Sequence, residues 1–84
     1  MKNKKNKKDL HLSDGARVYK IIDVVGTSKT DYEDAIRNAV RQASRTLDGL
    51  AWFEVSELRG MIQEGDVAEY QATLKVGFKV RSEA

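Results

Sequence analysis

The chain has neither cysteine nor proline and only one histidine among its 84 residues. Without cysteine it cannot form a disulfide, a thiolate site for zinc or an iron–sulfur cluster, or a cysteine nucleophile. No apolar run approaches the ~18 residues that a membrane span requires, and no signal-peptide core follows the first lysines. These absences indicate one small domain and favour a reducing, cytoplasmic location.

The charge of the chain is unevenly distributed. Fifteen basic and 13 acidic side chains give a net charge of +2, but five lysines lie within the first eight residues, so the remainder is net acidic. Residues 1–16 are rich in Lys and Asn and poor in large apolar side chains, which predicts a disordered N-terminal tail. We interpret the tail as a solvated leader. The alternative is a basic arm for nucleic acid or other anionic partners.

Residues 17–84 have the pattern of an α+β domain that begins with a strand. The run 18–25 is apolar and rich in β-branched side chains, which predicts a strand ending at Gly26. Apolar side chains fall on both faces of this strand, so we expect both faces to be covered. A turn is predicted at 26–30.

The next element is predicted to be an amphipathic helix. It begins with a capping box formed by Thr30 and Glu33, and it ends at Asp48, with Gly49 in the left-handed conformation. Its apolar side chains form one stripe, in which three small alanines allow a sheet to approach closely. The stripe consists of Tyr32, Ala35, Ile36, Ala39, Val40, Ala43 and Leu47.

Two strands joined by a two-residue turn at Glu64–Gly65 complete a predicted three-stranded antiparallel sheet. Residues 69–80 alternate strictly between polar and apolar side chains, whereas 50–63 alternate less cleanly. The order of elements is therefore β-α-β-β. Pairing through the turn places Trp52 opposite Gly77, Phe53 opposite Val76, Glu54 opposite Lys75, Val55 opposite Leu74, and Ser56 opposite Thr73.

The predicted protomer leaves too many apolar side chains uncovered for a stable monomer. A core of this size is only marginally stabilising, and one helix covers only one face of a sheet. Trp52, Leu58 and Ile62 are predicted on the face away from the helix, where they call for a partner or a ligand. We therefore expect an obligate oligomer.

Trp52 is the most informative residue of that face, because its neighbour Phe53 takes the inward position. Its indole is interpreted either as packing against another subunit or as a platform for a flat heteroaromatic ring. Gln71, outward on the adjacent strand, offers an amide that can both donate to and accept from a planar imide edge.

No constellation of catalytic residues is found. The one histidine, His11, lies in the predicted tail, so no histidine-based dyad or ligand set is available. Glu54 and Glu57 are predicted on opposite faces of their strand, where they cannot form a carboxylate pair. The acidic residues Asp31 and Asp34 are explained by capping of the helix rather than by metal binding. We expect neither an enzyme nor a metal site.

Five short motifs, in order and spacing, resemble a bacterial dodecin. They cover about residues 17–81, and the Lys-rich leader lies outside the family pattern. The motifs are Val18-Tyr19-Lys20, Val25-Gly26-Thr27-Ser28, Trp52-Phe53-Glu54-Val55 with Arg59-Gly60, Tyr70-Gln71, and Val76-Gly77-Phe78.

The resemblance implies a sheet that wraps its helix, and twelve protomers that form a hollow sphere. It also implies a non-catalytic, photoprotective store that binds FMN or a riboflavin-type flavin between symmetry-related tryptophans. Trp52 would stack on the flavin, Gln71 would bond its edge, and Arg59 would contact the phosphate of FMN. Glu57 is assigned to the same cofactor site. Met61 stands where archaeal relatives have an acidic residue, which favours FMN.

Other functions stay open at this point. Some bacterial relatives bind coenzyme A, but no residue of this chain can be assigned to that ligand. A nucleic-acid binder would use the Lys-rich tail and Trp52, although the net acidic domain lacks a basic stripe with interleaved aromatic side chains. A purely structural shell would use Trp52 for packing alone.

Overall fold

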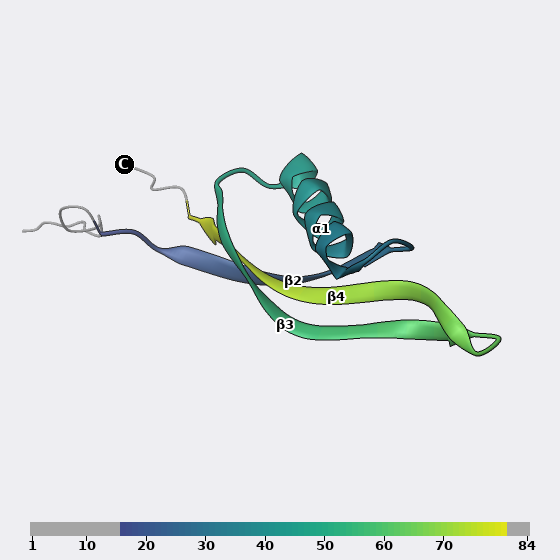
Figure 1. Cartoon of the computed structure of the whole chain (residues 1–84). Coiled ribbons are helices and arrows are strands. Elements are labelled where there is room, and N and C mark those ends of the chain that lie inside the picture. The colour runs from purple at the N-terminus through teal and green to yellow at the C-terminus, as the bar shows by residue number, and fades with distance from the viewer. Residues whose placement is uncertain (1–15, 81–84) are drawn as a thin grey trace, which may run out of the picture.

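The computed structural model describes residues 16–80. They form four elements: β2 (Tyr19–Ser28), α1 (Tyr32–Thr46), β3 (Leu50–Gln63) and β4 (Asp66–Lys79). The strands make one antiparallel sheet in the order β2-β4-β3, and α1 lies against one face of it (Figure 1). The predicted β-α-β-β protomer is confirmed, whereas the predicted tail lies outside the described residues apart from Ala16.

Strand β2 is longer than predicted. The turn expected at 26–30 is wrong in its first three residues, because β2 continues through Gly26 to Ser28. Gly26 lies beneath α1, where an added Cβ would overlap the carbonyl oxygen of Ala35. This glycine therefore permits close approach of the helix rather than reversal of the chain. The reversal follows Ser28, whose hydroxyl accepts a hydrogen bond from the backbone N–H of Thr30 at 2.9 Å.

The helix starts with a different cap from the predicted one. Asp31, not Thr30, is the N-cap residue, and its carboxylate accepts a hydrogen bond from the backbone N–H of Asp34 at 2.8 Å. An aspartate satisfies a free amide and adds negative charge at the positive end of the helix dipole. The predicted end is close: α1 stops at Thr46, and Gly49 has a φ of 76° in the left-handed region. No helix in residues 16–80 is long and apolar enough to cross a membrane.

The core lies between α1 and the central strand. Three small side chains of the predicted stripe are buried and bring the helix backbone close to β2 and β4. Leu74 and Val76 are the largest side chains that are fully buried, so the core of one protomer is small. The buried apolar residues are Ala35, Ala39 and Ala43 of α1 and Ala72, Leu74 and Val76 of β4.

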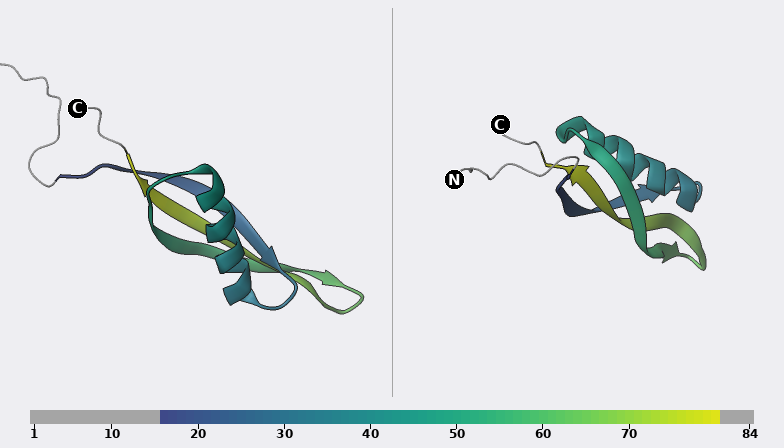
Figure 2. Two further views of the ribbon diagram at one scale, coloured as in Figure 1. Left: turned by 90° about the horizontal axis from the view of Figure 1, so that it is seen from above. Right: turned by 90° about the vertical axis from the view of Figure 1, so that its left-hand side faces the viewer.

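The hairpin of β3 and β4 has the predicted turn. Glu64 and Gly65 have φ values of 53° and 80°, which suits a two-residue hairpin connection of type I′. The predicted partners of the first four residues are confirmed: Trp52 with Gly77, Phe53 with Val76, Glu54 with Lys75, and Val55 with Leu74. Figures 1 and 2 show that this hairpin extends past the end of α1.

A β-bulge at Ser56 changes the second half of β3. Thr73 is paired with Glu57 instead of Ser56, and the Ser56 hydroxyl donates to the Thr73 carbonyl at 3.1 Å. A bulge places one extra residue in one strand, so the later side chains exchange faces. Leu58 consequently lies opposite buried Ala72 on the helix side, which corrects its predicted outward position.

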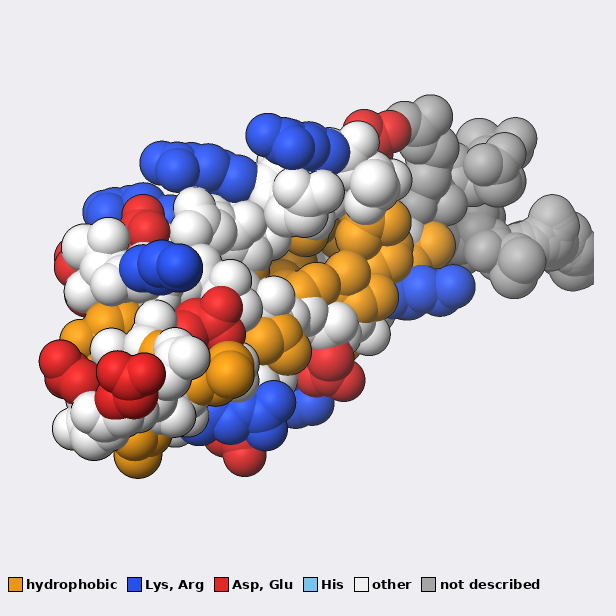
Figure 3. Space-filling view, turned by 90° about the vertical axis from the view of Figure 1, so that its right-hand side faces the viewer, with side chains coloured by type: hydrophobic (Ala, Val, Ile, Leu, Met, Phe, Trp, Pro, Cys, Tyr) orange, Lys and Arg blue, Asp and Glu red, His pale blue; other side chains and the backbone are white. Residues whose placement is uncertain are grey.

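The helix does not cover strand β3. All residues of β3 except Leu50 are exposed. Hydrophobic side chains form a band open to solvent between charged side chains (Figure 3). Apolar groups in such number are typical of an interaction surface. The exposed large hydrophobic residues are Val18, Tyr19, Ile21, Val25, Trp52, Phe53, Val55, Leu58, Met61, Ile62 and Val67.

Candidate functional site

Trp52 lies on the outer face, by which we mean the face of the sheet turned away from α1. It stands opposite Gly77, which is in turn opposite Ile21 of β2. The indole covers the glycine, since an added Cβ at position 77 would overlap its Cε2 and Cζ2 atoms. Glycine at 77 thus allows the ring to rest on the central strand. Trp52 remains 41% exposed, which leaves much of its flat surface open to a second ring.

Tyr19 flanks the indole. The centroids of the Tyr19 and Trp52 rings are 6.5 Å apart, and the rings are tilted by 55°. This spacing is within the range of favourable aromatic pairs, so Tyr19 helps to hold the indole in place. Together with Ile21, the two aromatic residues form an apolar cluster on the outer face.

A polar network lies further along the same face and connects β3 with β4. The Nε–H of Arg59 donates to Oε1 of Gln71 at 3.0 Å, and Nε2 of Gln71 donates to Glu69 at 2.9 Å. The Nη1 atom of Arg59 lies 3.6 Å from a carboxylate oxygen of Glu57. The bulge at Ser56 makes this network possible, because it turns Glu57 and Arg59 outward, toward Gln71 and Thr73.

The structure therefore brings together three of the four predicted site residues, Glu57, Arg59 and Gln71, but not the fourth. Gly77, which marks the position of Trp52, and Gln71 are six residues apart on β4, or about 20 Å of strand. That span exceeds the length of a three-ring heterocycle. One protomer cannot present both Trp52 and Gln71 to the same ring, so a site using both requires a second copy of the chain.

Sequence reasoning placed Glu54 and Glu57 on opposite faces, and this prediction is wrong. Glu54 is paired with Lys75 and Glu57 with Thr73, both on the outer face, because the bulge adds a residue between them. Within residues 16–80, no group of three or more His, Cys, Asp or Glu side chains is placed to hold a metal ion. Glu57 instead forms an ion pair with Arg59.

Three contributors to the outer face were missed from the sequence as site residues: Tyr19, Glu69 and Gly77. A signal existed for Gly77, since a glycine that interrupts a run of side chains opposite a tryptophan indicates a ring lying on the backbone. A signal existed for Glu69 as well, because residues two apart on a strand share a face. Tyr19 gave none, since its neighbour Trp52 lies two strands away.

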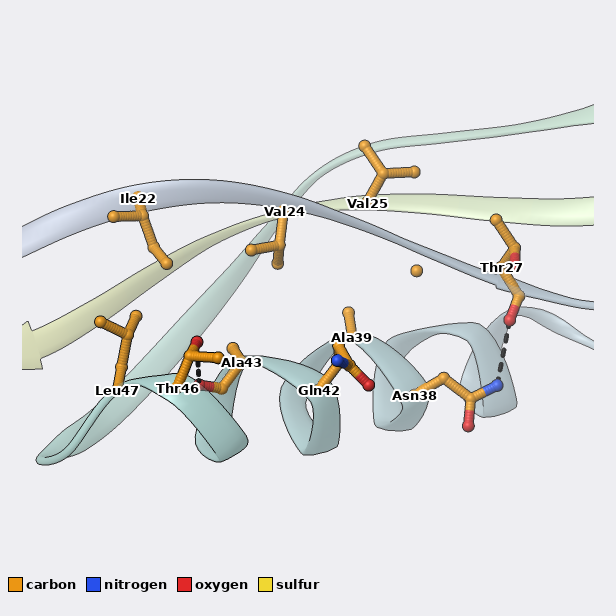
Figure 4. A pocket seen from close by; sticks show the side chains of 11 residues that line it. Ile22, Val24, Val25, Thr27, Asn38, Ala39, Gln42, Ala43, Thr46 and Leu47 are labelled. Atoms are coloured by element: carbon orange, nitrogen blue, oxygen red, sulfur yellow. Dashed lines mark hydrogen bonds between the residues drawn. The ribbon is translucent and has the colours of Figure 1, made fainter.

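The helix side of the sheet carries a groove that is separate from these residues. It lies between β2 and α1, has a volume of about 580 Å³, and is bordered by apolar side chains of both elements (Figure 4). Asn38 closes one end by donating a hydrogen bond to the Thr27 carbonyl at 3.0 Å. No titratable side chain lines this groove, and its apolar side chains are accompanied by the uncharged polar side chains of Thr27, Asn38, Gln42 and Thr46.

The fold and the outer face define a small α+β protein, one helix against a three-stranded antiparallel sheet, whose outer face carries an exposed tryptophan. The Dodecin family model matches residues 18–81 of this chain. A dodecin of Thermus thermophilus is 50% identical over 64 residues, which are 76% of this chain and 93% of the relative. The solved dodecin of Streptomyces coelicolor is 44% identical with a TM-score of 0.78, over 86% of this chain and all of that one.

A relative from Mycobacterium tuberculosis, called calcium dodecin, is 36% identical over 64 residues, covering 76% of this chain and 90% of its own. The matches span nearly the whole described domain. The chain belongs to the dodecin family, whose members are small proteins that form homo-oligomers.

Proposed function

We propose that this protein binds a flavin, FMN or a riboflavin-type molecule, at subunit interfaces of a hollow homododecamer in the cytoplasm. It stores and shields the flavin without chemical turnover. The observation that carries the proposal is the half-exposed indole of Trp52, spread over Gly77 on a face that one protomer leaves open. Membership of the dodecin family supports the same assignment.

Stacking on Trp52 accounts for both binding and shielding. An indole offers a large flat surface that stacks well on heteroaromatic rings. It is also an electron donor at contact distance, so an excited flavin stacked on it is quenched before it reacts. Tyr19 and Ile21 border the indole and extend the apolar surface around the ring.

The polar network of Glu57, Arg59 and Gln71 binds the edge of the flavin ring and the phosphate of FMN. Gln71 has donors and an acceptor for the imide edge of the isoalloxazine. Arg59 carries a permanent positive charge on the same face and attracts the phosphate of FMN, while Glu57 holds its guanidinium from one side. Because Trp52 and Gln71 are too far apart within one protomer, these groups act on one flavin only across an interface between copies.

The proposal is tested with Trp52→Ala and Gln71→Ala, titrated with FMN while the assembly is monitored. Stacking of this kind contributes ~1–3 kcal/mol per ring by analogy with bases on aromatic side chains, so Trp52→Ala should weaken FMN binding roughly tenfold to a hundredfold. Fluorescence of any bound flavin should also recover. Gln71→Ala should cost less, about 0.5–1.5 kcal/mol for one hydrogen bond, and should leave quenching intact.

Other functions are outcomes of the same titration. An assembled Trp52→Ala protein that binds FMN as tightly as the parent would show that the indole only packs, and a parent that ignores FMN would favour a structural shell. Binding of coenzyme A by such a parent would point to the alternative ligand. A salt-dependent shift with oligonucleotides that vanishes on deletion of residues 2–8 would support nucleic-acid binding.

A further inference from the structure

The amide of Gln71 is held between two charged side chains, and this arrangement has a consequence for the flavin proposed above. We propose that Glu69 is a positioning residue: it fixes which end of the Gln71 amide faces which neighbour, and so determines how the flavin edge is read. This inference rests on the proposed function, because it concerns the same ligand. It assigns a role to a residue that does not itself have to touch the flavin.

The two neighbours of Gln71 permit only one orientation of its amide. Arg59 has donors and no acceptor, and its Nε–H points at Oε1 of Gln71 at 3.0 Å. An ionised Glu69 has acceptors and no donor, and it receives Nε2 of Gln71 at 2.9 Å. A flipped amide would place NH₂ against the guanidinium and oxygen against the carboxylate. Both hydrogen bonds would then be lost and both contacts would be repulsive.

The orientation decides what Gln71 still offers to a ligand. A primary amide has two N–H donors and two acceptor lone pairs, and the neighbours use one of each. One donor and one acceptor remain, in a fixed order along the strand. The imide edge of a flavin is an N3–H donor between two carbonyl acceptors. A fixed amide accepts from N3–H and donates to the carbonyl on one particular side, so it selects one orientation of the ring.

The backbone around Glu69 is anchored from the helix side. Tyr70 lies between Glu69 and Gln71 and packs edge-on against Tyr32 of α1, with ring centroids 5.0 Å apart and an interplanar angle of 79°. Opposite Tyr70 is Gly60, where an added Cβ would come within 2.6 Å of the Glu69 carbonyl oxygen. The contact with the helix thus holds the backbone of residues 69–71 in place. The hydrogen bond from Gln71 to Glu69 then holds the Gln71 amide in place.

A double-mutant cycle tests this role in the assembled protein. Affinity for FMN is measured for the parent, Glu69→Ala, Gln71→Ala and the double variant. We expect Glu69→Ala to weaken binding about threefold to tenfold in the parent, which corresponds to part or all of one hydrogen bond. In the Gln71→Ala background the same change should have no effect, because Glu69 acts through that amide.

A second readout separates positioning from general weakening. N3-methylriboflavin carries a methyl group in place of the N3–H donor of riboflavin, and the parent should prefer riboflavin about threefold to tenfold. In Glu69→Ala the Gln71 amide can turn over. We therefore expect this variant to prefer riboflavin over N3-methylriboflavin less strongly than the parent does. Glu33→Ala removes the same charge from the exposed surface of α1, where Glu33 pairs with Arg37 at 3.0 Å, and serves as the control with unchanged flavin affinity and preference.

The proposal is overturned if Glu69→Ala weakens FMN binding equally with and without Gln71, or if the riboflavin preference is unchanged. Should Glu69→Ala fail to assemble, Glu69→Gln takes its place: its neutral amide no longer opposes the flipped Gln71, and the same loss of preference is expected. A parent that binds no flavin would reject the proposed function, whereas a parent that binds flavin and ignores Glu69 would reject this inference alone.

Discussion

At the scale of single residues, two features of the outer face depend on neighbouring side chains: the position of the Trp52 indole and the orientation of the Gln71 amide. Gly77 matters because it lacks a side chain, since any Cβ would occupy the place of the Trp52 indole. The charged residues Arg59 and Glu69 matter because each has hydrogen-bonding groups of only one kind, which gives Gln71 one orientation. An aromatic platform and an oriented amide are thus prepared separately, about 20 Å apart along the strand.

Gly77→Ala tests the platform without touching the tryptophan. The new methyl group must push the indole off the central strand, and the exposed ring can move at little cost to folding. We expect flavin affinity to fall about tenfold, within the range that stacking contributes, while the free energy of unfolding changes by less than about 1 kcal/mol. Titration with FMN and denaturant unfolding measure the two quantities.

The double variant Gly77→Ala with Trp52→Ala is the control for this prediction. If Gly77 acts only by seating the indole, the added methyl group has no effect once the indole is gone. A further loss of affinity in the double variant would mean that the flavin itself needs the space at position 77.

At the scale of elements, the closest packing is between α1 and β2. Gly26 lies against the helix backbone, and an added Cβ would overlap the Ala35 carbonyl and lie 2.7 Å from the Ala39 methyl group. Backbone atoms cannot turn aside as a side chain can, so a methyl group at Gly26 must displace the whole helix. The small alanine side chains of the helix and this one glycine together set the distance between helix and sheet.

Gly26→Ala is therefore expected to lower the free energy of unfolding by about 1–3 kcal/mol, the usual cost of overpacking. Denaturant unfolding followed by far-ultraviolet circular dichroism measures this loss. Gly77→Ala is the matched control, since it makes the same change against a movable side chain on the open face. Equal stability of the two variants would contradict the view that the helix is held at this glycine.

The sequence allowed the order of elements, the hairpin turn and the pairs around Trp52 to be predicted, because these follow from periodicity and local turn chemistry. It did not reveal the bulge at Ser56, since the two consecutive polar residues between Val55 and Leu58 do not by themselves distinguish an extra residue from an irregular alternation. The predicted faces of the residues directly after the bulge carried the error, which reversed Leu58 and separated Glu54 from Glu57, whereas the predicted turn at Glu64 was unaffected. Gly26 was misread for a related reason, because a glycine for close approach and a glycine for a turn look alike in sequence.

At the scale of the whole molecule, one protomer has a small core and a large exposed apolar surface. Among residues 16–80 the largest fully buried side chains are Leu74 and Val76, and β3 is exposed along nearly its entire length. Apolar side chains stay open on both sides of the sheet, Ile21 and Val25 on the outer face and Phe53 and Val55 on the helix side. We expect other copies of the chain to cover both faces.

We therefore expect folding and assembly to be one event. Light scattering at micromolar concentration should give about twelve times the chain mass of 9.5 kDa, as membership of the dodecin family indicates. Because subunits that fold only together are stabilised by mass action, the midpoint of unfolding should rise with protein concentration, and loss of helix should coincide with loss of assembly. Adding FMN should raise the midpoint further if the flavin bridges copies. A folded, monodisperse monomer would contradict the coupling, and with it any flavin site that depends on Trp52 and Gln71 from different copies.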